Sequence, residues 1–135
     1  MPYAAISYRV KEGYEDDLAR LFSNIGRVSS PVLHDESGKE VGMLLGTAVF
    51  IEGPMIVRFI HYSGGTLEDV ARHMSHQPAV HNFEEALQPY LAEERDTTTP
   101  EAFREFFTKS TMRCLTQASL ESWKAEAAGA QPESE

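Results

Sequence analysis

Two neighbouring apolar segments constrain the fold of this 135-residue chain more than any other feature of its sequence. Residues 43–51 and 55–62 read as strands, and Glu52-Gly53-Pro54 between them is typical of a tight hairpin turn. An antiparallel sheet with one wet face alternates apolar and polar residues, whereas these strands are apolar at both alternating sets of positions. Both faces of the sheet that contains them must therefore be covered.

The N-terminal third predicts a strand followed by a helix. Residues 3–10 place Ala4, Ile6 and Tyr8 on one face, which is the period of a strand. Residues 14–25 carry apolar side chains at helical spacing with acids in the first turn, and Gly26 is suited to the position after the helix.

The second half predicts helices with recognisable starts. Thr66 and Asp69 have the spacing of a capping box for a helix that ends before Pro78. Pro78 suits the first turn of another helix, and Thr99-Pro100 suits the start of a third. Residues 89–94 are a candidate fourth strand, and residues 111–115 a last extended segment.

The resulting order is β-α-β-β-α-β with an extra C-terminal helix, which predicts an α+β, ferredoxin-like fold. Its helices cover one face of the sheet, so a second copy of the chain is the economical cover for the other. We therefore expect a homodimer, the dimeric α+β barrel. We expect residues 1–118 to form this domain, and residues 119–135 an acidic, Ala-rich and flexible tail that is helical around Trp123.

Charge and composition exclude several classes of function. The formal net charge is −9, so a broad nucleic-acid surface or a polybasic membrane contact is not expected. The sequence has no run of about 18–20 apolar residues and no signal-peptide pattern at its start. Cys114 is the single cysteine, which favours a reducing compartment, so we expect a cytoplasmic protein.

The histidines do not predict a metal site. His73 and His76 form an H-x-x-H pattern with His81 five residues later, but a metal needs three ligands that converge on one point. We expect ordinary surface or boundary histidines and no metal. No nucleotide fingerprint, phosphate-binding loop or nucleophile elbow is present, so no cofactor is predicted.

Arg58 and His61 are the most unusual residues because they interrupt an apolar strand. Alternation places Arg58 and Tyr62 on one face and His61 on the other. A buried arginine needs either a carboxylate partner or a functional cavity, and both interpretations stay open. Tyr8, Phe22, Tyr62 and Met74 either form plain core or line a cleft between helices and sheet that suits a flat aromatic ligand.

The sequence also resembles the SchA/CurD-like family. The resemblance covers residues 2–116 and is carried by residues 2–13, 30–33, 44–50, 57–62, 71–74, 77–78, 89–91 and 111–114. It implies a place in type II polyketide pathways, such as those for spore pigments and aromatic antibiotics, without defining a reaction. A weaker similarity of residues 76–91 to tetracenomycin-type polyketide cyclases implies a ferredoxin-like dimer. Arg58 and Ile25-Gly26 stand nearest those cyclases' catalytic residues and do not match them.

Three hypotheses follow. The first is a cofactor-independent monooxygenase that binds an aromatic polyketide, with Arg58 stabilising its anion and His61 or His73 moving protons. The second is a cyclase that folds a poly-β-keto chain. The third is a non-catalytic dimeric partner that binds the polyketide or scaffolds the synthase, whose basic surfaces the negative charge would suit. We favour an enzyme, and oxygenation over cyclisation.

Overall fold

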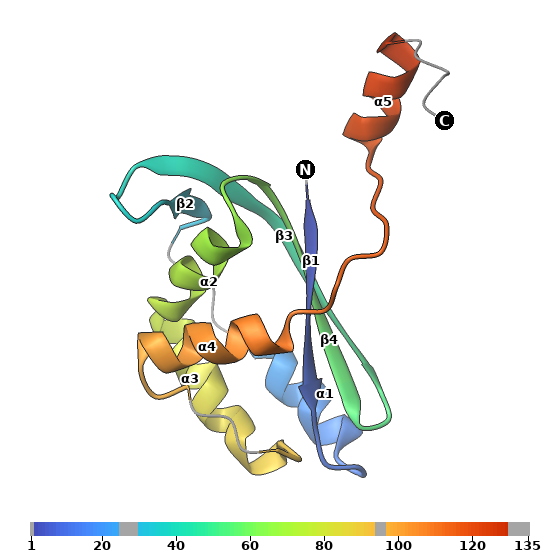
Figure 1. Ribbon diagram of the computed structural model, residues 1–135. Coiled ribbons are helices and arrows are strands. Elements are labelled where there is room, and N and C mark those ends of the chain that lie inside the picture. Colours follow the sequence, from blue (N-terminus) through green and yellow to red (C-terminus); the bar gives the residue numbers. More distant parts are fainter. Residues whose placement is uncertain (1, 25–29, 94–96, 130–135) are drawn as a thin grey trace.

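A single antiparallel sheet organises the computed structural model, which describes residues 2–24, 30–93 and 97–129. Its strands are β1 (Tyr3–Arg9), β2 (Val32–His34), β3 (Glu40–Glu52) and β4 (Met55–Gly64), in the order β1-β4-β3-β2. β3 and β4 form the predicted hairpin, in which Gly53 adopts a positive φ of 58° (Figure 1). β2 pairs with the far edge of β3.

The helices lie on one face of this sheet. They are α1 (Glu15–Ser23), α2 (Leu67–Ser75), α3 (Pro78–Leu87) with the short 3-10 turn η1 (Gln88–Tyr90), and α4 (Pro100–Ser110). α5 (Leu120–Gly129) lies apart from them (Figure 1). None of the described helices combines the length and apolar character needed to span a bilayer.

Local signals set the helix starts as predicted. The Thr66 hydroxyl accepts a hydrogen bond from the Asp69 N–H at 3.2 Å, and the Asp69 carboxylate accepts one from the Thr66 N–H at 2.8 Å. This capping box satisfies two N–H groups that the first turn leaves without helical partners. Pro78 and Pro100 stand in the first turns of α3 and α4, and Thr99 caps α4. α1 also matches its prediction, although Ile25 and Gly26 lie outside the described residues.

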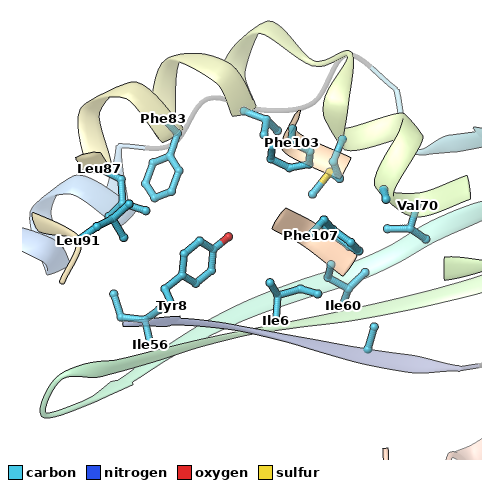
Figure 2. Packing of buried hydrophobic residues seen from close by; sticks show 14 of the residues in the cluster. Ile6, Tyr8, Ile56, Ile60, Val70, Phe83, Leu87, Leu91, Phe103 and Phe107 are labelled. Atoms are coloured by element: carbon cyan, nitrogen blue, oxygen red, sulfur yellow. The ribbon is translucent and has the colours of Figure 1, made fainter. Parts of the chain in front are cut away.

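The core fills the space between the helices and one face of the sheet (Figure 2). Ile6 and Tyr8 of β1 and Ile56 and Ile60 of β4 point toward the helices, as the period of two requires. The helices contribute apolar side chains that face them: Val70, Phe83, Leu87, Phe103 and Phe107.

The predicted ferredoxin-like α+β class is confirmed, but the predicted fourth strand is wrong. β1, β3 and β4 take the places of the first three ferredoxin strands. Residues 88–90 instead form η1, and Leu91 makes only an isolated bridge to Val10. Pro89 explains the error, because a proline lacks the N–H that a strand ladder needs and suits a helical first turn.

In place of that strand, individual hydrogen bonds from other parts of the chain occupy the outer edge of β1. The Ala92 N–H donates to the Arg9 carbonyl at 2.9 Å, and the Met112 N–H donates to the Ala5 carbonyl at 2.8 Å. The Tyr3 N–H donates to the Gln117 side-chain oxygen at 2.9 Å. The predicted extended segment at 111–115 thus lies beside β1, joined to it by a single bridge between Thr111 and Ile6.

The second face of the sheet, here called the outer face, is open in the single chain. Met43 and Phe50 of β3 and Phe59 of β4 project from it and are 43%, 60% and 43% exposed. The expectation that both faces are apolar therefore holds. The second copy that would cover the outer face stays a prediction, as does the division of the chain at residue 118.

Candidate functional site

Arg58 lies in the middle of β4 and projects toward the helices. Its neighbours across the sheet are Ile6 and Val49. The guanidinium carbon stands 5.8 Å from the centroid of the Phe83 ring, within the range of a cation–π contact. The Arg58 Nε is buried and has no hydrogen-bond partner in the structure. No ion pair joins Arg58 to a carboxylate among the described residues, although the buried Glu84 lines the same small cavity as Arg58.

Tyr8, Met74 and Phe83 surround Arg58 but leave little room. The cavity that they share measures about 20 Å³. That volume admits one water molecule, since a water needs about 10–15 Å³, but no aromatic ring. Phe22 packs edge to face on Phe83, with 4.6 Å between ring centroids, so it adds to the same packed core. Tyr8, Phe22 and Met74, which were predicted to line a cleft, therefore lie close to Arg58 as expected. In this structure, however, they form packed core and not an open cleft.

Tyr62 lies toward the other end of β4, on the same face as Arg58 as predicted. Burial raises the pKa of its hydroxyl above 10.0, and the negative charge of Asp69 raises the pKa further. The Tyr62 hydroxyl is therefore protonated at neutral pH and suits hydrogen-bond donation better than proton abstraction.

The three predicted catalytic residues do not meet at one point. His61 projects from the opposite face to Arg58 and stacks on Tyr3, with 4.2 Å between ring centroids and 14° between ring planes. His73 lies on α2, where burial lowers its pKa below 6.5 against the opposing effect of a hydrogen bond with the Ser30 backbone. The Nε2 atoms of both histidines are buried without a hydrogen-bond partner.

The remaining histidines match the ordinary roles expected for them. His76 is exposed at the end of α2, and the His81 ring contacts the Ser75 carbonyl. Among residues 2–24, 30–93 and 97–129, no cluster of three or more histidine, cysteine, aspartate or glutamate side chains is placed to hold a metal ion.

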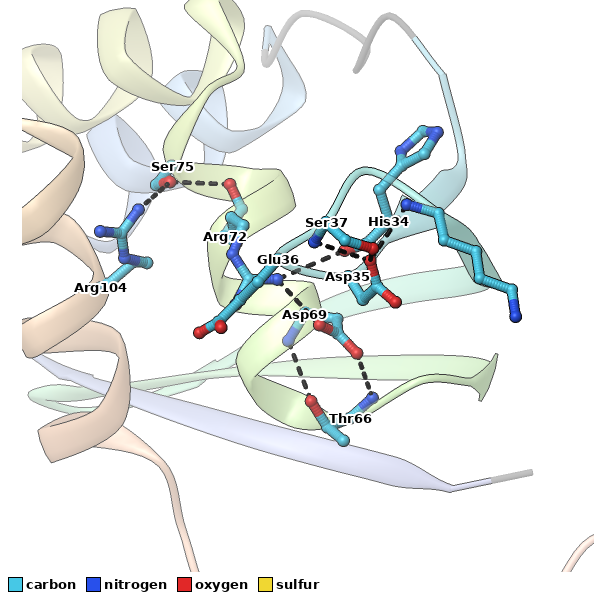
Figure 3. A network of polar contacts seen from close by, with 10 residues as sticks. His34, Asp35, Glu36, Ser37, Thr66, Asp69, Arg72, Ser75 and Arg104 are labelled. Carbon is cyan, nitrogen blue, oxygen red and sulfur yellow. Dashed lines mark hydrogen bonds and ion pairs between the residues drawn. The ribbon is translucent and has the colours of Figure 1, made fainter.

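A polar network ties α2 to the β2–β3 connection (Figure 3). The Arg72 guanidinium donates to the Asp69 carboxylate at 2.8 Å and to the His34 carbonyl at 3.3 Å. Burial pushes the pKa of Asp69 upward, but hydrogen bonds from Arg72 and Thr66 more than offset it and hold that pKa below 3.8. Arg104 on α4 reaches the Ser75 hydroxyl at 3.5 Å. These groups satisfy one another, so the network fixes the helices in place.

A larger hollow lies on the outer face of the sheet. This groove has a volume of about 520 Å³ and is lined mainly by apolar surface. β1 and β4 form its floor, and the segment that follows α4, residues 112–118, forms its wall. The lining residues are Tyr3, Ala4, Ala5, Val57, Phe59, Met112, Arg113, Cys114, Leu115, Thr116, Gln117 and Ala118. His61 stacks directly behind the Tyr3 ring.

Sequence reasoning missed this groove. The alternation of residues 3–10 and 55–62 does identify Tyr3, Val57 and Phe59 as side chains of the outer face. Nothing in the sequence places Arg113 beside them, because that depends on how the chain after α4 returns along the edge of β1.

Comparison with known proteins confirms the resemblance seen in the sequence. The family model described as the SchA/CurD like domain matches residues 1–120. The chain belongs to this family. Its curated relatives include a 42.8 kDa protein in the whiE locus of Streptomyces coelicolor, 37% identical over 84% of this chain and 27% of the relative.

Two further members of the family are similar at 32% identity. They are the polyketide synthase CurD of Streptomyces cyaneus and the protein SchA of Streptomyces halstedii, each matched over 80% of this chain and over 28% and 27% of their own lengths. The chain thus spans about a quarter of the length of the curated relatives it matches. The similarity defines a shared domain.

Proposed function

We propose that this chain acts on an aromatic polyketide intermediate, which it binds in the groove on the outer face and oxygenates without a cofactor. The pathway is supported by the family and by the name of one relative, a polyketide synthase. The reaction is inferred from the chemistry of the groove.

The groove has the size and surface that a flat polyphenol needs. Its volume of about 520 Å³ falls within the roughly 300–1,000 Å³ of small-molecule sites, whereas the 20 Å³ cavity beside Arg58 falls far below it. Val57 and Phe59 offer an apolar floor, and the Tyr3 ring offers an aromatic surface on which a planar ligand can stack. This difference in volume between the groove and the cavity beside Arg58 is the main support for placing the ligand in the groove.

Arg113 gives the apolar groove a positive charge. A guanidinium beside a bound phenol favours the phenolate, and the phenolate is the electron-rich form that can reduce dioxygen. We assign removal of the proton to the stacked pair of Tyr3 and His61, because an imidazole ring can act as a general base. The roles that the sequence suggested for an arginine and a histidine are thus assigned to Arg113 and His61.

The reaction balances without an added reductant. An anthrone-type substrate loses both hydrogens of one ring methylene, and that carbon becomes a quinone carbonyl. One oxygen atom of O₂ enters the carbonyl, and the other leaves as water with the two hydrogens. The substrate supplies all four electrons, so the protein has to bind, deprotonate and shield the ring.

The test is incubation of the purified chain with an anthrone-type tricyclic polyphenol under ¹⁸O₂. We expect one labelled oxygen in the quinone and an initial rate above that of buffer alone. Arg113→Gln should lower the rate roughly tenfold, equivalent to about 1.4 kcal/mol of lost transition-state stabilisation. Arg113 is exposed, so this variant should keep its fold. Val57→Trp should narrow the groove and weaken binding, whereas Glu85→Trp adds the same ring at an exposed position of α3 as a matched control.

Other outcomes of this experiment would support a different function for the chain. Unlabelled products with a rearranged carbon skeleton from a poly-β-keto substrate would replace oxygenation by cyclisation. A polyphenol that binds in the groove and stays unchanged would leave the non-catalytic partner of the synthase as the function. Full activity in Val57→Trp would remove the groove from the proposal.

A further inference from the structure

The wall of the groove is positioned with little help from burial. Residues 112–118 form neither helix nor strand, and every one of them is exposed. Leu115, in the middle of the wall, is 81% exposed. Packing against the core therefore contributes little to the position of the wall, and hydrogen bonds must hold it.

Two hydrogen bonds tie the wall to the edge of β1, one near each end. The Met112 N–H donates to the Ala5 carbonyl at 2.8 Å, and the Gln117 side-chain oxygen accepts the Tyr3 N–H at 2.9 Å. Among the described residues, no hydrogen bond joins residues 113–116 to β1. The wall is the orange segment that leads from α4 to α5 in Figure 1. It is thus anchored at two points and free between them.

The wall is longer than the stretch of β1 that it spans. Met112 and Gln117 are five residues apart, which is up to about 17 Å in extended chain. Ala5 and Tyr3, their partners on β1, are two residues apart, or about 7 Å. The Gln117 side chain makes up only part of this difference. The wall must therefore bow away from β1 between its anchors, and the bow leaves room for the groove.

The anchor at Gln117 should open more readily than the anchor at Met112. Met112 follows closely on α4, and Thr111 before it bridges to Ile6. Gln117 holds β1 through one exposed side-chain oxygen, which also accepts the Cys114 thiol at 3.9 Å. One such hydrogen bond at the surface shifts an equilibrium by roughly two- to tenfold. The far end of the wall is therefore closed most of the time but opens often.

The Gln117 anchor also joins the two sides of the proposed reaction. Tyr3, whose N–H it accepts, lines the groove and stacks on His61. Arg113 lies on the wall itself, between the two anchors. When the Gln117 hydrogen bond breaks, the bow is free to swing away from β1, and Arg113 moves with it. Closure therefore sets the distance between the cation and the stacked pair across a bound ring.

We propose that Gln117 is a latch, which closes the wall over a ligand by accepting the Tyr3 N–H and releases the wall for the ligand to enter and leave. In the reaction Gln117 is a positioning residue, because it acts by holding Arg113 over the ring and not by contact with the reacting atoms. The latch does not depend on the ligand, but its role in the reaction rests on the proposed function.

Trypsin measures the latch, because it cleaves after Arg113 when the wall swings free. Gln117→Met keeps the length of the side chain and removes the oxygen, so it should speed cleavage after Arg113 roughly fivefold. Gln117→Glu keeps an acceptor oxygen and should restore slow cleavage. Gln117 is exposed, so neither variant should change the fold. Cleavage after Lys39, which is exposed just before β3, is the internal control and should change by less than about twofold.

Amide hydrogen exchange measures the latching bond directly. In Gln117→Met, the Tyr3 amide hydrogen should exchange roughly fivefold faster than in the wild type. The Tyr62 N–H, which donates to the neighbouring Pro2 carbonyl at 3.1 Å, is the matched control and should keep its exchange rate. The comparison separates loss of the latch from general loosening of this end of the sheet.

A double-mutant cycle tests the role in the reaction. Gln117→Met alone should lower kcat/KM for oxygenation roughly fivefold. If Gln117 acts by positioning Arg113, adding Gln117→Met to Arg113→Gln should lower kcat/KM by less than about twofold further. A purely structural role would multiply the two losses. In the wild type, a stable anthraquinone-type polyphenol at saturating concentration should also protect Arg113 from trypsin.

Each part of the proposal has a result that would overturn it. Equal cleavage after Arg113 in the wild type and in Gln117→Met would overturn the latch, as would equal exchange of the Tyr3 amide hydrogen. Losses that multiply in the double variant would overturn the positioning role. Failure of the proposed function gives a different pattern: Gln117→Met would still speed cleavage and exchange, but no polyphenol would protect Arg113 and no labelled oxygen would appear in the product.

Discussion

Replacing Arg58 by methionine should stabilise the protein, which is unusual for a change in the middle of a sheet. The Nε of Arg58 is buried without a partner, and an unsatisfied buried donor costs about 1–3 kcal/mol. The contact with Phe83 contributes only about 0.5–1 kcal/mol, because Arg58 is partly exposed and solvent screens its charge. Methionine keeps the unbranched shape of the side chain and loses both effects. We expect a net gain of about 1 kcal/mol.

Calorimetric or denaturant unfolding measures this gain. For a domain of this size, 1 kcal/mol corresponds to roughly 3–5 °C in Tm. Arg58→Ala is the matched control, because it removes the same charge but enlarges the 20 Å³ cavity and should lose about 2 kcal/mol. The pair separates the effect of the charge from the effect of packing.

Two outcomes would contradict this reasoning. A loss of more than about 1 kcal/mol in Arg58→Met, with stability kept in Arg58→Lys, would mean that the cation is paired and structural. A stabilised Arg58→Met that fails to oxygenate the polyphenol would mean that Arg58 takes part in the reaction, and the reacting atoms would then belong beside it instead of in the groove.

Two further predictions concern stability. Gly64→Ala should cost more than about 2 kcal/mol in thermal unfolding, because φ is +70° there and an added Cβ would stand 2.2 Å from the Val41 carbonyl oxygen; Gly46→Ala, with open space around it, should cost much less. Because burial lowers the pKa of His73 below 6.5, the unfolded chain binds its proton first, so stability should fall as pH drops from 7 through 6.5 and level off below the folded pKa. His73→Gln should remove that slope and His76→Gln should keep it; an unchanged slope in His73→Gln would refute the assignment.

The sequence predicts those parts of the fold that short stretches of chain determine. Thr66 and Asp69 need only each other to form a capping box, and Pro78 suits the first turn of a helix through its own fixed φ and missing N–H. The hairpin at Gly53 follows in the same way from three residues. The order of these locally determined helices and strands along the chain predicted the ferredoxin-like class of fold.

Non-local contacts explain what the sequence did not predict. Residues 89–94 have a strand-like pattern, but the ladder they would join depends on an edge of β1 that the segment after α4 already contacts through Met112 and Gln117. Arg58 was correctly placed on the helix face, yet the volume left beside it depends on how Phe83 and Phe103 pack from two different helices. The position of Arg113 in the groove depends on the path of residues 112–118, for which no local pattern exists.

The contacts along β1 also bear on solubility. A bare outermost strand can template the addition of further chains into open-ended fibrils. Here the Gln117 side chain and the Met112 amide bond to the edge of β1, and both belong to residues 112–118, the segment that follows α4. A truncation before residue 112 would therefore expose the edge of β1 to pairing with other chains, whereas a truncation after Ala118 would keep these contacts.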